Sequence, residues 1–210
     1  MERQPADSPY ARTVESYEQI ADDYARETAG AGVLSNALTR LAETVPAGHV
    51  LEIGSGPGWD ADALEEAGMT VRRTDITQAF IDFQRARGKE ADRLDVITDD
   101  LDGPYDAVVA LHVLQHVEPD DLAAVLAKVA GALRPDGRFL VSIPLGEGIG
   151  WEVGESGRTY YQVLRTEAEF VAALAQAGLR SEWTERADHD EETGWLCVLS
   201  QLRVDQVSTS

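Results

Sequence analysis

Apolar and polar residues follow two different periods along the chain. Runs such as HVLEIG (49–54) and YDAVVALHVL (105–114) are apolar almost throughout, which is typical of strands buried on both faces. Elsewhere apolar residues recur at spacings of three and four, as from Leu122 to Leu133, and this spacing predicts amphipathic helices. Strands and helices that alternate in this way predict a doubly wound α/β sheet.

The N-terminal part of the pattern is helical and carries aromatic residues. Val14, Tyr17, Ala21 and Tyr24 fall on one face of a predicted helix, and residues 35–44 predict a second helix. Both helices precede the first strand candidate. We therefore expect them to form an N-terminal helical cap on the sheet core.

The C-terminal part departs from the alternation. Strand candidates at 179–185 and 194–203 follow each other without a helix, so we expect them to pair antiparallel. The glycine-rich segment 145–161, LGEGIGWEVGESGRTYY, predicts an irregular loop. A length of 210 residues suits a single domain, with a helical cap over 1–45 and a sheet core over 46–204.

Charge and composition narrow the classes of partner. A formal net charge of -20 repels phosphate backbones and anionic lipids, so we expect neither nucleic acid nor membrane as a partner. No apolar run has the length of a signal peptide core or a membrane span, which predicts a cytoplasmic protein. Cys197 is the only cysteine and excludes an internal disulfide. Monomer and homodimer both remain open.

The segment LEIGSGPGW (51–59) runs from a strand into a loop with glycine at every second position. A P-loop would end in Gly-Lys-Ser/Thr, but the chain has Gly58, Trp59 and Asp60. A dinucleotide loop would need glycine in place of Trp59, and the charge of Glu52 disfavours a nearby pyrophosphate. The loop suits an amino-acid ligand better, with N–H groups for a carboxylate and an acid for an ammonium. A tight turn without a ligand is the alternative.

Two further acids end predicted strands on the same edge of the sheet. Asp75 follows the glycines by about twenty residues, where an acid can accept hydrogen bonds from ribose hydroxyls. Asp95 follows the third strand candidate and could accept from an adenine amine, with the Val96 N–H facing the ring. Asp99 and Asp100 compete with Asp95 for that role. Each acid also fits an ordinary role as a turn residue, a helix cap or a solvated charge.

Five segments stand in the order of the motifs of one family: VLEIGSGPGWDA, VRRTD, LDVITDDL, YDAVVALHVLQHV and LRPDGRFLVSIP. The chain resembles the class I S-adenosylmethionine-dependent methyltransferases from Val50 to Pro144. The resemblance implies a Rossmann-like seven-stranded sheet of order 3-2-1-4-5-7-6 with an antiparallel last strand and additional N-terminal helices. It also implies an enzyme that uses S-adenosyl-L-methionine and releases S-adenosyl-L-homocysteine.

The resemblance assigns parts of the cofactor to segments of the chain. The glycine loop is expected to hold the methionyl end, Asp75 the ribose and Asp95 with Val96 the adenine, while the N-terminal aromatic helix covers the cofactor. The implied cofactor-binding residues are Tyr24, Glu52, Gly54, Ser55, Gly56, Asp75, Ile76, Asp95, Val96, Leu111 and His112.

Methyl transfer from a sulfonium requires few catalytic groups. The protein has to align donor and acceptor, exclude water and, for a protonated acceptor, remove a proton. His112 is the candidate general base. His112 and His116 are four residues apart and would share a helical face, but no third ligand accompanies them, so we expect no metal site.

The acceptor site is expected beside the glycine-rich segment 146–161. Trp151, Arg158, Tyr160 and Tyr161 are its candidate substrate residues, in a loop that either closes as a lid or anchors a surface crossover. The sequence thus predicts methyl transfer to oxygen or nitrogen of a small molecule. Two alternatives stay open: a nicotinamide-dependent oxidoreductase, which the glycine loop disfavours, and a methyltransferase-like binding subunit without catalysis.

Overall fold

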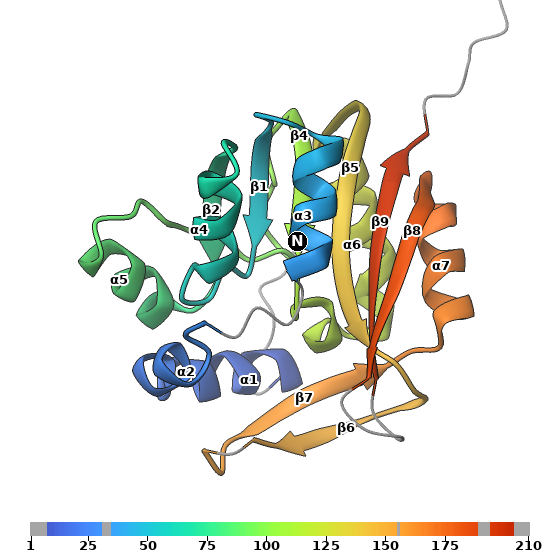
Figure 1. Ribbon diagram of the computed structural model, residues 1–210. Coiled ribbons are helices and arrows are strands. Elements are labelled where there is room, and N and C mark those ends of the chain that lie inside the picture. Colours follow the sequence, from blue (N-terminus) through green and yellow to red (C-terminus); the bar gives the residue numbers. More distant parts are fainter. Residues whose placement is uncertain (1–7, 31–34, 155, 189–193, 204–210) are drawn as a thin grey trace, which may run out of the picture.

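A seven-stranded sheet with helices on both faces forms the centre of the computed structural model, which describes residues 8–30, 35–154, 156–188 and 194–203 (Figure 1). The order β3-β2-β1-β4-β5-β9-β8 confirms the predicted topology, with β9 antiparallel to both of its neighbours. The strands of this sheet are β1 (His49–Ile53), β2 (Thr70–Asp75), β3 (Asp92–Arg93), β4 (Tyr105–Ala110), β5 (Leu133–Pro144), β8 (Leu179–Asp188) and β9 (Gly194–Leu202).

Helices pack against both faces of the sheet and across one of its ends. Among them, α3 shares a buried cluster with β1, β4 and β9, and α6 and α7 share the cluster on the opposite face. The helices are α1 (Pro9–Glu18), α2 (Ala21–Glu27), α3 (Ser35–Thr44), α4 (Trp59–Glu66), α5 (Gln78–Ala86), the 3₁₀ turn η1 (Leu114–His116), α6 (Pro119–Ala132) and α7 (Glu167–Gln176).

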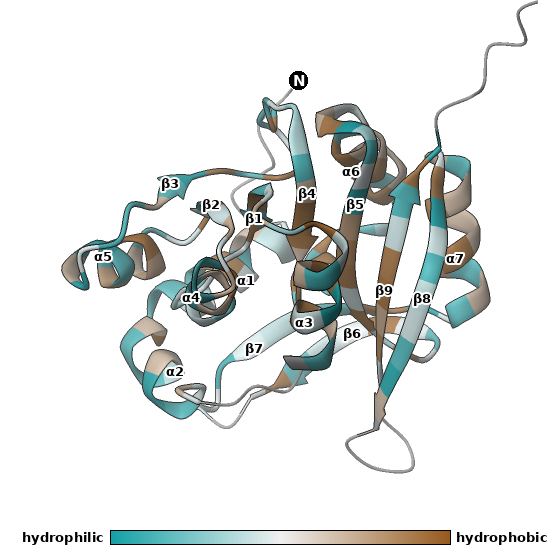
Figure 2. Ribbon diagram, turned by 45° about the horizontal axis from the view of Figure 1, so that its top comes forward, coloured by the Kyte–Doolittle hydropathy of each residue, from teal (hydrophilic) through white to brown (hydrophobic). Residues whose placement is uncertain are grey.

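Strand β4 shows why its sequence is apolar from Ala107 to Ala110. Ala107 and Val109 belong to the cluster with α3, whereas Val108 and Ala110 belong to the cluster with α6. Successive side chains of a strand point to opposite faces, so a strand covered on both faces needs apolar residues at every position. The middle strands are accordingly among the most hydrophobic parts of the ribbon (Figure 2).

The elements beyond the carboxyl ends of the parallel strands form a cover. There α1 and α2 lie across the end of the sheet, next to a separate hairpin of β6 (Gly148–Val153) and β7 (Thr159–Leu164) (Figure 1). Two hydrogen bonds join α1 to β7: Ser16 Oγ donates to the Thr159 carbonyl at 2.9 Å, and the Tyr161 N–H donates to Thr13 Oγ1 at 2.9 Å. The cover is therefore one packed layer of helix and hairpin.

Three local predictions were wrong. The N-terminal helix breaks between α1 and α2, because the chain turns at Ile20 and buries that side chain. The third strand shrinks to Asp92–Arg93. The glycine-rich segment predicted as an irregular loop contains the β6–β7 hairpin, in which Ile149, Trp151 and Val153 alternate with glycine and Glu152. That alternation has the period of a strand, and the glycines obscured it.

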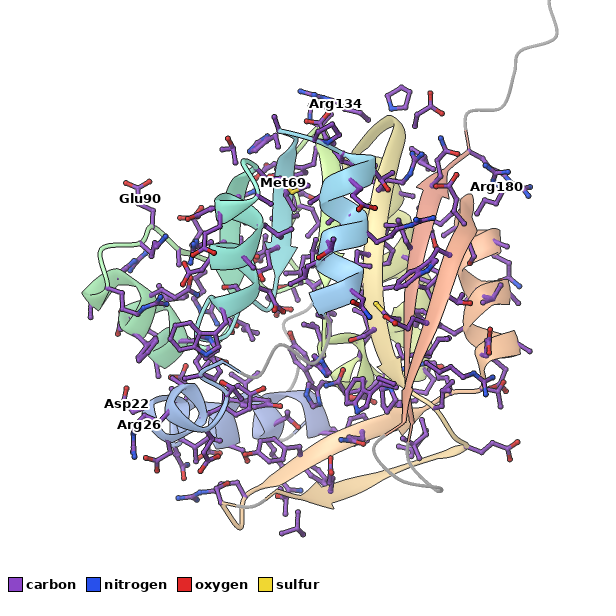
Figure 3. The ribbon with its side chains drawn as sticks, viewed as in Figure 1. Asp22, Arg26, Met69, Glu90, Arg134 and Arg180 are labelled. Atoms are coloured by element: carbon purple, nitrogen blue, oxygen red, sulfur yellow. The ribbon has the colours of Figure 1, made fainter. Side chains whose placement is uncertain are left out.

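Charged side chains such as Glu90, Arg134 and Arg180 project outward from the rims of the fold (Figure 3). Within the described parts of the chain, none of the helices combines the length and the apolar content required to cross a membrane.

Candidate functional site

A cavity of about 280 Å³ lies at the carboxyl ends of β1, β2 and β4, beneath α1 and α2. Ligands of doubly wound sheets bind at this edge, outside the carboxyl ends of the strands. The structure brings together eight of the sequence-predicted cofactor residues in its lining: Tyr24, Gly54, Ser55, Gly56, Asp75, Ile76, Leu111 and His112.

The glycine loop between β1 and α4 is shaped by close packing. Gly58 has a φ of 86°, and a Cβ there would lie 2.6 Å from Gln84 Oε1 and 2.7 Å from Arg73 Nη1. A Cβ on Gly54 would collide with Val113. At Gly56, in contrast, a Cβ would meet no atom within 4 Å, so the chain leaves open space there. The loop is thus tightly packed at both ends and open at its middle.

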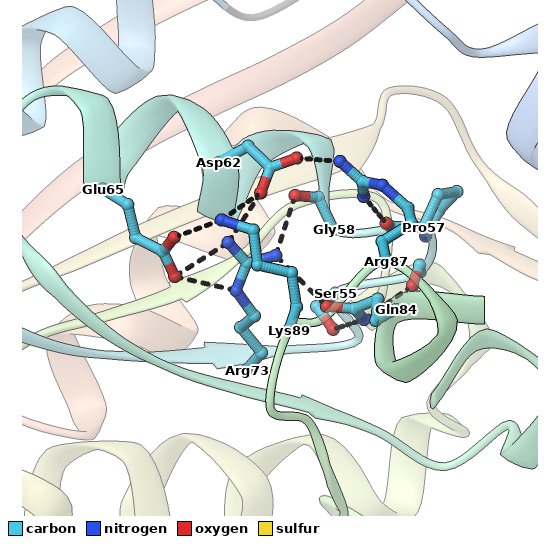
Figure 4. Close-up of polar contacts among 10 residues, drawn as sticks. Ser55, Pro57, Gly58, Asp62, Glu65, Arg73, Gln84, Arg87 and Lys89 are labelled. Atoms are coloured by element: carbon cyan, nitrogen blue, oxygen red, sulfur yellow. Dashed lines mark hydrogen bonds and ion pairs between the residues drawn. The ribbon is translucent and has the colours of Figure 1, made fainter. Parts of the chain in front are cut away.

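Side chains from β2 and α5 hold the carbonyl groups of this loop (Figure 4). The amide of Gln84 donates to the Gly56 carbonyl at 2.8 Å and to Ser55 Oγ at 2.8 Å. Arg87 donates to the Pro57 carbonyl at 3.0 Å, and Arg73 donates to the Gly58 carbonyl at 3.3 Å. Three consecutive carbonyls therefore point away from the cavity and are fixed by donors that lie behind the loop.

Asp75 connects the glycine loop to the end of β2. Its Oδ2 accepts from the Gly56 N–H at 2.8 Å, and its Oδ1 accepts from the Thr77 N–H at 2.8 Å. The side chain is buried but lines the cavity. Burial raises the pKa of Asp75, while the N–H donors of Thr77 and Gly56 oppose that rise. Asp75 is therefore both part of the wall and a structural link between two loops.

Glu52 lies outside the cavity lining. It is 3% exposed, and its Oε2 has no hydrogen-bond partner among the described residues. Burial and the neighbouring Asp60 carboxylate raise the pKa of Glu52 well above its usual range, which favours the protonated form. Asp60, in the first turn of α4, is half-buried and lines the cavity. Of Glu52 and Asp60, only Asp60 lines the cavity where a ligand can reach it.

Asp95 and Val96 also lie outside the lining, but Asp95 is linked to it. Its Oδ1 accepts from the Ile97 N–H at 2.9 Å and from the Tyr10 hydroxyl at 3.3 Å, and Tyr10 lines the cavity. Asp99 is exposed and accepts from the Asp95 N–H through Oδ2 at 2.9 Å. Of these two acids as candidate partners for an adenine, Asp95 is the one that contacts a residue of the cavity wall.

Lys128 holds the segment that follows Asp95. Its Nζ donates to the carbonyls of Val96, Ile97 and Asp99 at 2.9, 2.8 and 2.7 Å. We expect Lys128→Met to lower the free energy of unfolding by about 1–2 kcal/mol, because methionine preserves the apolar stem but leaves three carbonyls without this donor. Urea unfolding measures the change. An unchanged midpoint would show that water replaces the ammonium at no cost.

His112 follows β4 in a sharp turn. Its φ is 57°, a left-handed conformation that is uncommon outside glycine, and its N–H donates to Ser142 Oγ at 2.8 Å. Its ring lies 4.2 Å from that of Trp195, measured between centroids. The turn means that His112 and His116 do not share a helical face. Within the described residues, no group of three His, Cys, Asp or Glu side chains is placed to bind a metal ion.

The four predicted substrate residues all lie in or next to the β6–β7 hairpin and outside the cavity lining. Tyr160 reaches it indirectly, because its ring packs 4.7 Å from that of Tyr17. Trp151 is exposed, as are Ile149 and Val153 of the same strand, and Arg12 lies over its ring. Arg158 is also exposed. Tyr161 contributes its carbonyl, which lies 2.6 Å from His116 Nδ1.

Most of the remaining lining residues have no role that was predicted from the sequence. The additional lining residues are Tyr10, Thr13, Val14, Tyr17, Thr28, Pro57, Trp59, Asp60, Thr77, Phe80, Val113 and His116. Many belong to α1 or to the turn after β4, so their place in the site depends on how α1 docks. The aromatic N-terminal segment with Tyr17 and Tyr24 was expected to cover the site, and Tyr10, seven residues before Tyr17, is the further aromatic residue that its spacing could have added.

Part of the chain is similar to known methyltransferases. Residues 51–139 match a family described as a methyltransferase domain. The ubiquinone biosynthesis O-methyltransferase of Xylella fastidiosa is 32% identical over 50% of this chain and 46% of its own length. The mitomycin biosynthesis 6-O-methyltransferase of Streptomyces lavendulae is 27% identical over 77% of this chain and 52% of its own length. The chain spans about half the length of these curated relatives.

A solved structure extends the match in the fold to nearly the whole chain. The 1,6-didemethyltoxoflavin-N1-methyltransferase of Burkholderia thailandensis superposes with a TM-score of 0.73 at 21% identity, over 97% of this chain and 94% of its own. That structure contains bound 1,6-didemethyltoxoflavin and S-adenosylhomocysteine. The matched residues 51–139, the strand order of the sheet and the glycine loop at its carboxyl edge are all consistent with a methyltransferase fold. Residues 51–139 thus resemble a methyltransferase domain, and the chain has the fold of a solved methyltransferase.

Proposed function

We propose that this protein transfers a methyl group from S-adenosyl-L-methionine to oxygen or nitrogen of a small-molecule acceptor. One observation carries the proposal: the cavity at the carboxyl edge of the sheet combines the open glycine loop with the anchored Asp75. We further propose that residues 46–204 form the core of one domain and residues 1–45 its cap, of which α1 and α2 lie across the end of the sheet while α3 packs on its face. Residues 1–7, 31–34, 155, 189–193 and 204 of these ranges lie outside the described residues.

The residues present fit this cofactor. The open middle of the glycine loop accommodates a methionyl end, Asp75 presents a carboxylate to a ribose, and Tyr10, beside Asp95, lies in the wall toward an adenine. When bound, S-adenosylmethionine supplies an electrophilic methyl group on its sulfonium. The chain then has to orient the acceptor and exclude water, which the aromatic side chains of Tyr17, Tyr24 and other cover residues do.

Calorimetry with the purified chain tests the proposal directly. We expect both S-adenosylmethionine and S-adenosylhomocysteine to bind, and a methylation screen of metabolite pools to identify the acceptor. The absence of binding of either compound at millimolar concentration would overturn the proposal. Titration with reduced nicotinamide cofactor, followed by fluorescence, provides the negative comparison.

Asp60 is the residue proposed here to face the ammonium of the methionyl end. We expect Asp60→Asn to weaken S-adenosylhomocysteine binding about fivefold, because a half-buried charge pair contributes about 1 kcal/mol. Glu52→Gln is the matched control and should change the affinity less than twofold, since glutamine resembles the protonated form that burial favours. If Glu52→Gln weakened binding more than Asp60→Asn, Glu52 would be the ammonium partner.

A further inference from the structure

A hydrogen-bonded pair of side chains stands in the cavity wall between α1 and η1. His116 Nδ1 lies 2.6 Å from the carbonyl oxygen of Tyr161, and His116 Nε2 lies 3.2 Å from the hydroxyl of Tyr17. Both Tyr17 and His116 line the cavity. Neither the glycine loop nor Asp75 depends on this pair, so its place in the wall calls for a separate explanation.

The hydrogen-bond partners determine where the imidazole carries its proton. A carbonyl only accepts, so the short contact with Tyr161 requires a proton on Nδ1. Burial lowers the pKa of His116 to about 4 despite that bond, so the ring is neutral near pH 7 and Nε2 is an acceptor. Gln115 Nε2 donates to the His112 carbonyl at 2.7 Å, which fixes its amide, and also lies 3.2 Å from His116 Nε2. His116 Nε2 thus faces two donors.

Tyr17 consequently donates its proton to His116. Burial raises the pKa of Tyr17 well above its usual range, so the hydroxyl keeps that proton. Its ring is held by Tyr24, Phe80 and Tyr160, with centroids 5.8, 6.0 and 4.7 Å away. Because the Tyr17 hydroxyl donates its proton to His116 Nε2, its oxygen can interact with a ligand only through its lone pairs. The wall therefore contains a fixed hydrogen-bond acceptor among aromatic rings.

We propose that Tyr17 positions the methyl acceptor by accepting a hydrogen bond from the O–H or N–H of the atom that is methylated, and that the site selects flat, aromatic acceptors bearing such a group. The inference rests on the proposed methyltransferase function. An acceptor held by its proton keeps a lone pair of the same atom free for the methyl group. His116 is a weak base in this setting, so Tyr17 and His116 position the acceptor and do not store its proton, which passes to solvent when the methylated atom gains its new bond to the methyl carbon.

The test compares two probes that differ in their hydroxyl groups. Catechol and its dimethyl ether, 1,2-dimethoxybenzene, are titrated into protein saturated with S-adenosylhomocysteine and followed by nuclear magnetic resonance. We expect the wild-type chain to bind catechol at least five times more tightly than the ether. Tyr17→Phe should reduce that ratio to less than two, while S-adenosylhomocysteine binding changes less than twofold.

Two further variants separate positioning from general damage to the site. Tyr10→Phe also removes a hydroxyl from the wall, but that hydroxyl bonds to Asp95, so the ratio should persist. His116→Leu removes the acceptor of the Tyr17 proton and lets Tyr17 donate to the ether, so the ratio should fall as in Tyr17→Phe. Thermal unfolding identifies a variant that fails to fold, in which case Tyr17→Phe decides alone.

The outcomes distinguish this inference from the proposed function. If S-adenosylhomocysteine binds but Tyr17→Phe keeps the probe ratio, the role of Tyr17 is overturned and the methyltransferase function stands. Absence of catechol binding to the saturated wild-type protein at millimolar concentration overturns the aromatic hydroxyl class of acceptor. Failure of S-adenosylhomocysteine to bind the wild-type chain overturns the proposed function itself.

Discussion

Replacement of Asp75 by alanine is expected to weaken the binding of S-adenosylhomocysteine between tenfold and a hundredfold. The carboxylate accepts from the Gly56 and Thr77 N–H groups at 2.8 Å each and lines the cavity. Alanine removes the proposed ribose acceptor and leaves two backbone donors unpaired at the site. A tenfold loss corresponds to about 1.4 kcal/mol, well within the cost of losing hydrogen bonds to a charged group.

Isothermal titration calorimetry measures this effect, and two variants define its origin. Asp75→Asn retains one acceptor oxygen but turns an N–H₂ group toward a backbone N–H, so we expect an intermediate loss. Asp99→Ala removes an exposed acid from the competing register and should leave the affinity within a factor of two. An Asp75→Ala chain with wild-type affinity would refute the ribose assignment.

The architecture was predictable because it is set by patterns that the sequence carries locally. The apolar run at 107–110 requires burial on both faces, and the capping box of Thr166 and Glu169 starts α7 as its spacing indicates. Two strands without a helix between them had to pair antiparallel, as β8 and β9 do. The β6–β7 hairpin was missed because five glycines between 146 and 157 weigh toward a loop, although the apolar period of two was present.

The residues of the candidate site that stand at strand ends were predictable, whereas those that depend on how the cover helices and the β6–β7 hairpin pack were not. Asp75 and the glycine loop meet because β1 and β2 are neighbours in the sheet. Spacing alone could not show that Glu52 points into the interior while Asp60, in the first turn of α4, faces the cavity. The partners of Tyr17 and His116 are also invisible in the sequence, because they come from helices and a hairpin whose packing no short motif encodes.

The network behind the glycine loop ties cofactor binding to fold stability. Arg73 is 2% exposed and donates to Asp62 Oδ1 at 2.7 Å, to Glu65 Oε1 at 2.9 Å and to the Gly58 carbonyl (Figure 4). Burial raises the pKa of Asp62, but hydrogen bonds from Arg87, Arg73 and Lys89 outweigh this effect. Together they lower the pKa of Asp62 to about 2. Because that pKa is depressed on folding, Asp62 stabilises the fold above about pH 4, and this contribution is lost as the pH falls toward 2.

Arg73→Leu is therefore expected to lower the free energy of unfolding by about 3 kcal/mol at neutral pH, since it leaves the carboxylates of Asp62 and Glu65 and the Gly58 carbonyl without their buried donor. For a chain of this size the loss lowers Tm by about 6–12 °C.

Arg134→Leu is the matched control. This arginine lies at the opposite end of the sheet, is half exposed and pairs with Asp106 (Figure 3). Its loss should therefore cost less than about 1 kcal/mol. Replacing a complete buried ion pair by apolar residues is often neutral, but here only one partner is removed. Equal losses in the two variants would show that the network behind the loop stabilises the fold no more than an ordinary surface ion pair.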